Sequence, residues 1–172
     1  MKNDSVKIIT CGGTFEKVYD PITGNLIFEK SHVPELIKKS RITRETTFEN
    51  LMMIDSLDMT EQHRKLIATN IRDSIEKKIL IIHGTDTMIE TGKAIAALSK
   101  PNQTIVLTGA MIPISMNKSD AFFNFGYSLA VIELLNPGVW IAMTGKVFQY
   151  NKVKKNLKLG IFEQHVTCQY KS

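Results

Sequence analysis

Ile79-Leu80-Ile81-Ile82-His83-Gly84-Thr85-Asp86-Thr87 is the stretch that decides the fold of this 172-residue chain. Its first four residues are apolar and mostly β-branched, which is typical of a short strand buried on both faces. Glycine and polar residues then end the strand, and residues 89–99 follow with a helical pattern. A buried strand, a polar turn and a helix in succession form the repeating unit of a parallel α/β sheet.

The same alternation recurs along the chain. Apolar runs predict further strands at residues 6–10, 50–54, 104–107 and 139–143, with a short edge strand at 24–28. The helices predicted between them are residues 32–40, a segment that Thr60 caps with Leu66, Ile67, Ile71 and Ile75 at helical spacing, and one from Ser119 or Asp120 through Leu135. The tail from Lys152 is lysine-rich and polar. We therefore predict an α/β fold, a three-layer sandwich with a mainly parallel sheet, Rossmann-like or flavodoxin-like.

Composition bounds the class of protein. Hydrophobic residues make up 43% of the chain and charged residues 23%, as in ordinary globular proteins, and the length fits one domain over residues 1–172. No apolar stretch reaches the roughly 18 residues that a membrane-spanning helix needs, so no membrane partner is expected. The net charge of +5 comes from dispersed lysines, which favours a basic surface over nucleic-acid binding. With no signal-peptide core and only Cys11 and Cys168, we expect no disulfide framework and a cytoplasmic location.

Hydroxyl and glycine residues gather where the predicted strands end. Cys11-Gly12-Gly13-Thr14 follows the first strand, Asp55-Ser56 the second, and His83-Gly84-Thr85 the third. Ligands of open α/β sheets bind beyond the carboxyl ends of strands, and glycine lets the backbone approach them closely. We therefore expect Thr14 and Thr85 on one rim, where the N–H groups of Gly13, Thr14 or Thr85 form an oxyanion hole.

A threonine hydroxyl becomes a nucleophile only when a base removes its proton. Asp86, Lys155 and His83 are the bases that the sequence offers. A structural alternative stays open at this point, because Thr85 and Asp86 are also preferred caps for the helix that follows.

Cofactor sites find no support in the sequence. The glycines before Thr14 fit neither the dinucleotide-binding fingerprint nor the P-loop, so we expect no nucleotide. The four histidines have no metal-ligand spacing, so we expect neither a metal nor another cofactor. The apolar runs Met111-Ile112-Pro113-Ile114 and Phe122-Phe123-Asn124-Phe125 are interpreted as core or subunit contact.

Over residues 6–155 the chain resembles the amino-terminal domain of the bacterial-type L-asparaginase (asparaginase/glutaminase) family. The family motif T-G-G-T-I appears as Cys11-Gly12-Gly13-Thr14-Phe15, and H-G-T-D-T-M is intact from His83 to Met88. The G-S-x-D-M segment appears as Asp55-Ser56-Leu57-Asp58-Met59. The stretch 107–113 and the following Ser119-Asp120 also match.

The resemblance implies a cofactor-free hydrolysis of L-asparagine to L-aspartate and ammonia, carried out by a homo-oligomer. It makes Thr14 the nucleophile, on a mobile loop that also carries Tyr19. It joins Thr85 to Lys155 and Asp86, with Lys152 or Lys154 as alternatives to Lys155. The roles implied for substrate binding are Ser56 for the α-carboxylate, Asp86 for the α-ammonium, N–H groups near Gly13 and Thr85 for the oxyanion, and Leu57 at a position where the family has a glutamine.

The resemblance also marks one large departure, because the family's carboxy-terminal domain has no counterpart in these 172 residues. We therefore expect a short, single-domain form. A non-catalytic module that binds amino acids or regulates a partner, and a fragment of a two-domain enzyme, are the alternative hypotheses.

Overall fold

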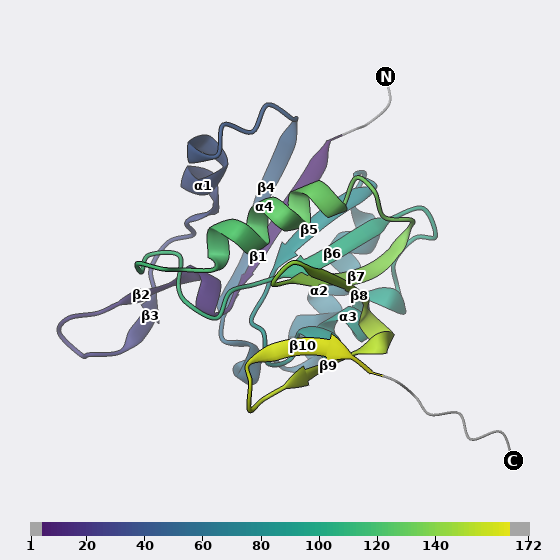
Figure 1. Ribbon diagram of the computed structural model, residues 1–172. Helices are drawn as coiled ribbons and strands as arrows, with labels where there is room; N and C mark the ends of the chain where they lie inside the picture. Colours follow the sequence, from purple (N-terminus) through teal and green to yellow (C-terminus); the bar gives the residue numbers. More distant parts are fainter. Residues whose placement is uncertain (1–4, 166–172) are drawn as a thin grey trace, which may run out of the picture.

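The computed structural model describes residues 5–165 and places a six-stranded sheet at the centre of the molecule (Figure 1). The strand order is β4-β1-β5-β6-β7-β8, and all neighbours are parallel except β7 and β8. The strands are β1 (Val6–Gly12), β4 (Thr46–Ile54), β5 (Lys78–Ile82), β6 (Thr104–Thr108), β7 (Gly138–Met143) and β8 (Lys146–Gln149). The first five follow the flavodoxin-like order, which confirms the predicted mainly parallel α/β sheet.

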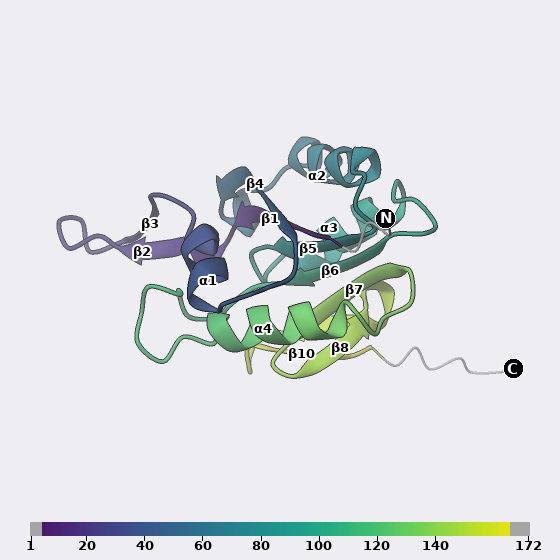
Figure 2. The same ribbon diagram turned by 90° about the horizontal axis from the view of Figure 1, so that it is seen from above.

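Helices cover both faces of the sheet, as the three-layer prediction requires. On one face, α2 (Glu61–Asp73) and α3 (Met88–Ala96) pack Ile67, Ile71 and Ile95 against Ile79 and Ile81 of β5. On the other face, α1 (Val33–Lys39) and α4 (Ala121–Val131) pack Leu36 and Phe125 against Leu80 and Ile82. Figure 2 shows α2 and α4 on opposite sides of the sheet. The apolar run of β5 is continuous because alternate residues serve two cores.

The predicted helix ends are confirmed in part. Thr60 caps α2, and its Oγ1 accepts a hydrogen bond from the His63 N–H at 3.4 Å. Leu66 and Ile75, by contrast, are exposed, so they do not share the buried face of Ile67 and Ile71 although the helical spacing includes all four. Leu66 is one residue out of step with the Ile67–Ile71 stripe, and Ile75 lies beyond the end of the helix.

The start of α4 resolves the choice between its two predicted caps. The hydroxyl of Ser119 accepts from the Ala121 N–H at 3.1 Å, whereas the Asp120 carboxylate accepts from the N–H groups of Met111 and Ile112. Asp120 therefore shapes the loop before the helix rather than capping it. The helix ends at Val131, one turn earlier than the sequence pattern predicts.

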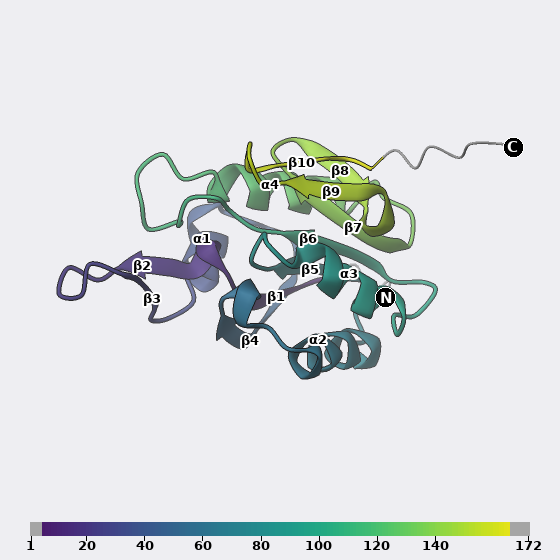
Figure 3. The same ribbon diagram turned by 90° about the horizontal axis from the view of Figure 1, so that it is seen from below.

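Two small hairpins complete the described fold. The predicted edge strand at 24–28 is β3 (Leu26–Phe28), but it pairs with β2 (Lys17–Tyr19) in an arm that projects from the body (Figures 1 and 3). The polar tail contains β9 (Val153–Asn156) and β10 (Ile161–Gln164), an antiparallel pair that the sequence did not indicate. Short 3-10 turns are η1 (Thr14–Glu16), η2 (Ser56–Asp58) and η3 (Tyr150–Lys152).

Two further expectations concern cysteines and membranes. Cys11 is buried and unpaired, whereas Cys168 lies outside the described residues. Within residues 5–165, no helix has the length and apolar character needed to cross a membrane.

Candidate active site

The turns that carry Thr14 and Thr85 meet at the point where the strand order reverses. From β1 the chain crosses to β4 on one side, and later returns to β5 on the other side of β1. Thr14 directly follows β1 in η1, and Thr85 follows β5. A Cβ atom added to Gly13, whose φ is +74°, would lie 2.3 Å from the Gly84 nitrogen. The two turns therefore touch through their glycines, at the place where this class of fold binds ligands.

Thr85, Asp86 and Lys155 form one hydrogen-bonded group. The Lys155 ammonium nitrogen lies 2.7 Å from the Thr85 Oγ1 and 2.7 Å from the Asp86 Oδ1. The lysine side chain is 9% exposed, and that of Asp86 is 39% exposed. The amine of the largely enclosed Lys155 side chain therefore faces the Thr85 hydroxyl on one side and the solvent-exposed Asp86 carboxylate on the other.

The geometry also separates Lys155 from its two neighbours in sequence. Lys154 pairs with Glu163 across the β9–β10 hairpin at 3.3 Å. Lys152 lines a separate surface pocket with Tyr127 and Lys146. Of these three lysines, Lys155 is the one that contacts Thr85.

His83 is engaged elsewhere and does not reach the Thr85 hydroxyl group. Its Nδ1 lies 2.7 Å from the Gly84 carbonyl oxygen, and its Nε2 lies 2.9 Å from the Thr91 hydroxyl. Because a carbonyl can only accept, Nδ1 donates and Nε2 accepts from Thr91. Complete burial lowers the pKa of His83 to about 4, which keeps the ring neutral. The sequence-based suggestion that His83 is the base is therefore wrong, and the ring instead fixes the turn.

Ser56 presents a buried hydroxyl next to the Thr85 turn. Within residues 5–165 its Oγ finds no hydrogen-bond partner, although the atom is buried. The side chain packs on Gly84, because a Cβ there would lie 2.5 Å from the Ser56 Oγ. The Thr87 hydroxyl donates to the Ser56 carbonyl at 2.7 Å and fixes the turn. An unpaired buried polar group beside a ligand-binding rim is typical of a contact that a ligand completes.

One predicted contact is contradicted by the geometry. The Gly13 N–H donates to the Ile54 carbonyl at 2.9 Å, so it is not available to an oxyanion. The next N–H, of Thr14, opens η1, and the first N–H groups of a helical turn have no partner within it. The N–H groups of Thr14 and Thr85 therefore remain as the predicted oxyanion donors.

Tyr19 and Leu57 lie at the margin of the site. Tyr19 is exposed at the end of β2 on the projecting hairpin (Figure 3). The base of that hairpin is anchored, because the Glu16 carboxylate accepts from the Ser31 hydroxyl at 2.7 Å and from the His32 N–H at 2.8 Å. Leu57 is 72% exposed beside Ser56. The mobility of the loop stays a prediction.

Asn124 is a supporting residue that sequence reasoning placed only in the core or a subunit contact. Its side-chain amide donates to the Gly109 carbonyl at 3.0 Å and accepts from the Thr144 N–H at 2.9 Å. It therefore ties the ends of β6 and β7 together below the rim. The signal for it was an amide set within the apolar Phe122-Phe123-Asn124-Phe125 run.

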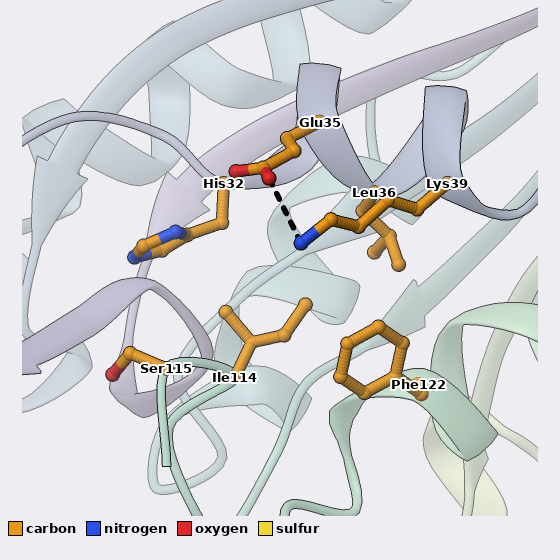
Figure 4. A pocket seen from close by; sticks show the side chains of 7 residues that line it. All are labelled: His32, Glu35, Leu36, Lys39, Ile114, Ser115 and Phe122. Carbon is orange, nitrogen blue, oxygen red and sulfur yellow. Dashed lines mark ion pairs between the residues drawn. The ribbon is translucent and has the colours of Figure 1, made fainter.

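A pocket of about 260 Å³ lies apart from these residues (Figure 4). It opens between α1 and the segment after β6, and its walls are His32, Glu35, Leu36, Lys39, Ile114, Ser115 and Phe122. None of the predicted site residues lines it. Within the described part of the chain, no group of three or more His, Cys, Asp or Glu side chains is arranged to hold a metal ion.

Comparison with known proteins gives consistent matches. The family model described as "Asparaginase, N-terminal" matches residues 5–161. The chain is 33% identical over 153 residues to a subunit of the glutamyl-tRNA(Gln) amidotransferase of Methanosphaera stadtmanae, a match that covers 84% of this chain and 34% of that protein. It is 30% identical over 139 residues to L-asparaginase 1 of Escherichia coli, a match that covers 76% of this chain and 41% of that protein.

A solved structure extends the match to three dimensions. The probable cytoplasmic L-asparaginase from Campylobacter jejuni has a TM-score of 0.81 at 27% identity, covering 94% of this chain and 53% of that one. The chain therefore spans between about a third and a half of the length of these relatives. Its motifs, its sheet and the family model that matches most of its length show that the chain belongs to the asparaginase family and corresponds to the amino-terminal domain of its members.

Proposed function

We propose that this chain is a cytoplasmic, cofactor-free amidohydrolase that converts L-asparagine and water to L-aspartate and ammonia. The observation that carries the proposal is the contact of the Lys155 ammonium with Thr85 and Asp86, at the strand end beside the Thr14 turn. Two hydroxyls, a largely enclosed lysine and a carboxylate on one rim form a nucleophile-and-base arrangement. Helix capping alone gives no reason for Lys155, 70 residues away, to reach Thr85.

In the proposed mechanism, the Thr14 hydroxyl oxygen adds to the side-chain amide carbon of asparagine. With Lys155 acting as the free amine, the Thr85–Lys155–Asp86 group accepts the proton that Thr14 loses and delivers it to the amide nitrogen, so the C–N bond breaks and ammonia leaves. Water then hydrolyses the ester between Thr14 and the aspartyl group, which restores the hydroxyl and releases aspartate. The N–H groups of Thr14 and Thr85 stabilise the oxyanion in both steps. Tyr19 completes the site when the hairpin moves toward the rim.

In this proposal the substrate is recognised by two side chains, Ser56 and Asp86, that each have an oxygen without a hydrogen-bond partner in the described residues. The unpaired Ser56 hydroxyl donates to the substrate α-carboxylate. Asp86 uses its Oδ1 for Lys155, and its exposed side chain leaves the second oxygen for the α-ammonium. Leu57 offers no hydrogen bond at this place, so we expect weak binding of asparagine.

The proposal extends to assembly and to the length of the chain. Met111, Ile112, Phe122 and Phe123 are exposed apolar side chains, and the Phe123 ring stacks on Tyr127 with 5.9 Å between centroids. A second copy of the chain would cover these surfaces, in line with the proposed homo-oligomer. The 172 residues act as a single domain in this proposal, with no membrane or nucleic-acid partner.

The similarity to a component of an amidotransferase supports a second candidate function. In that case the same residues release ammonia from an amide, and a partner protein transfers that ammonia to a second substrate. A non-catalytic module that binds amino acids, or a fragment of a longer enzyme, would keep the fold without turnover.

Ammonia release from the purified chain, measured with L-asparagine, L-glutamine and succinamate, tests the proposal. Succinamate lacks the α-ammonium, so the loss of turnover relative to asparagine measures how much the proposed contact of Asp86 with that ammonium contributes. Turnover that is highest with asparagine and lost in Lys155→Met supports the hydrolase. Binding of L-aspartate without ammonia release supports the binding module, and neither binding nor turnover supports the fragment.

A further inference from the structure

The turn that carries Thr14 is bonded on both of its sides to the strand end that leads into Ser56. Before Thr14, the Gly13 N–H donates to the Ile54 carbonyl at 2.9 Å. After it, the Lys17 ammonium donates to the Asp55 carboxylate at 2.5 Å. Ile54 and Asp55 directly precede Ser56. Thr14 is therefore bracketed by two links to the segment that presents the unpaired hydroxyl.

The two oxygens of Asp55 serve the two sides of this junction. Oδ2 accepts from Lys17, and Oδ1 accepts from the Leu57 N–H at 3.1 Å, which shapes the turn that contains Ser56. Partial burial would raise the pKa of Asp55, but the hydrogen bonds from Lys17 and Leu57 hold it below its ordinary value. The carboxylate is therefore charged at neutral pH and joins the η1 and η2 turns.

Lys17 extends the junction to the hairpin and to the loop before α4. Its ammonium lies 5.5 Å from the centre of the Phe28 ring on β3. Its carbonyl accepts from the Ser115 hydroxyl at 2.9 Å, and the neighbouring Ile114 N–H donates to the Phe15 carbonyl at 3.1 Å. The side chain is 17% exposed, and its partner Asp55 is 28% exposed. One lysine thus holds three segments in a partly buried setting.

We propose that Lys17 and Asp55 are positioning residues that hold the Thr14 hydroxyl in register with Ser56. The inference rests on the proposed function, in which Ser56 binds the substrate α-carboxylate and Thr14 attacks its amide carbon. Those two hydroxyls must be spaced to match one small substrate, and a misplacement of about 1 Å can cost a hundredfold in rate. The pair contributes by geometry, because neither side chain takes part in the proposed proton transfers.

The chain contains a matched control pair. Lys7 of β1 and Glu49 of β4 form an ion pair at 2.7 Å, with side chains 15% and 34% exposed, close to the exposures of Lys17 and Asp55. Lys7 lies near the amino-terminal end of β1, away from the rim. Lys7→Met therefore removes a comparable ion pair without touching the Thr14 or Ser56 turns.

Steady-state ammonia release by Lys17→Met, Asp55→Asn, Lys17→Arg and Lys7→Met tests the kinetic consequence, at a temperature where each variant is folded. We expect Lys17→Met and Asp55→Asn to lower kcat by about 10- to 100-fold while KM stays within about threefold, since Ser56 and Asp86 are retained. Lys17→Arg should restore most of kcat, and Lys7→Met should lower stability only. Normal kcat in Lys17→Met and Asp55→Asn, or an equal loss in Lys7→Met, overturns the proposal.

Amide hydrogen exchange without ligand gives a readout that needs no activity. The amides of residues 13–19 should exchange at least about tenfold faster in Lys17→Met and Asp55→Asn than in the wild type, and not in Lys7→Met. Unchanged exchange in all variants overturns the positioning role. Absence of turnover in the wild-type chain would reject the proposed hydrolase, whereas the exchange result still decides whether this pair fixes the Thr14 turn.

Discussion

The ammonium of Lys155 lies 2.7 Å from the hydroxyl oxygen of Thr85, although 70 residues separate them along the chain. The contact exists because the β9–β10 hairpin folds back over the carboxyl end of β5. Lys155 alternates with its neighbour Lys154, which points away and pairs with Glu163. Side chains on successive strand residues face opposite sides, so a shift of one residue would remove the lysine from the site.

Loss of the Lys155 amine should abolish most of the activity. We expect Lys155→Met to lower kcat for asparagine by about a hundredfold or more, the range that a proton-transfer group contributes. Thr85→Val removes the hydroxyl that the lysine contacts and should cause a similar loss. Lys154→Met is the matched control and should keep kcat within about twofold, since its charge faces Glu163 at a partly exposed pair. Equal losses of kcat in both lysine variants would show that Lys155 has no specific role in the reaction.

Thr14 should be required for turnover but not for folding. It stands at the end of β1, and Thr14→Ala should lower kcat by about a hundredfold or more if its hydroxyl is the nucleophile. Thr14→Ser keeps a hydroxyl and should retain measurable turnover. Thermal unfolding of Thr14→Ala should match the wild type. Near-normal ammonia release by Thr14→Ala would transfer the nucleophile role to Thr85.

Leu57 offers a gain-of-function test. We expect Leu57→Gln to supply a hydrogen bond to the substrate ammonium, and hydrogen bonds to charged groups contribute about 1.5–3 kcal/mol, so KM should fall by about tenfold or more. The side chain is exposed, so the substitution should not disturb packing. Leu134→Gln, at an exposed position in the turn after α4, is the control and should leave KM unchanged. An unchanged KM in Leu57→Gln would place the ammonium elsewhere.

The parallel strands and both threonine turns could be predicted because buried parallel strands are continuous apolar runs that end in polar residues. The run Ile79-Leu80-Ile81-Ile82 gave β5 to within one residue. The strands β8, β9 and β10 could not be predicted in the same way. Each has four residues with mixed polar and apolar character, and their pairing depends on contacts that are distant in sequence.

The hydrogen-bond partners of individual groups in the site could not be predicted from the sequence. The motif around Gly13 suggests an N–H that faces a ligand, but the bulge where β1 meets β4 turns that N–H toward Ile54. His83 was offered as a base because its residue type fits, whereas full burial and two polar neighbours give it a structural role. Residue type indicates which chemistry is available, and only the packing decides which groups remain free to perform it.

The buried His83 should make stability depend on pH. Its folded-state pKa is about 4, whereas an unfolded histidine has a pKa of about 6.5. Between these values the unfolded chain binds a proton that the folded chain excludes, so the free energy of unfolding falls as the pH drops from 6.5 to 4. A difference of about 2.5 pKa units corresponds to a loss of about 3 kcal/mol over that window. Above pH 6.5 this contribution is constant.

The comparison with His83→Asn isolates this effect, because an asparagine amide can replace Nδ1 as the donor to the Gly84 carbonyl. The variant should be less stable at pH 7, since Thr91 loses its partner. Carboxylates such as Asp55, whose pKa is also lowered, weaken both proteins equally as the pH falls. Urea unfolding at several pH values between 7 and 4 should therefore show a steeper loss in the wild type, so that the two curves converge. Parallel curves would mean that His83 is not held neutral in the folded protein.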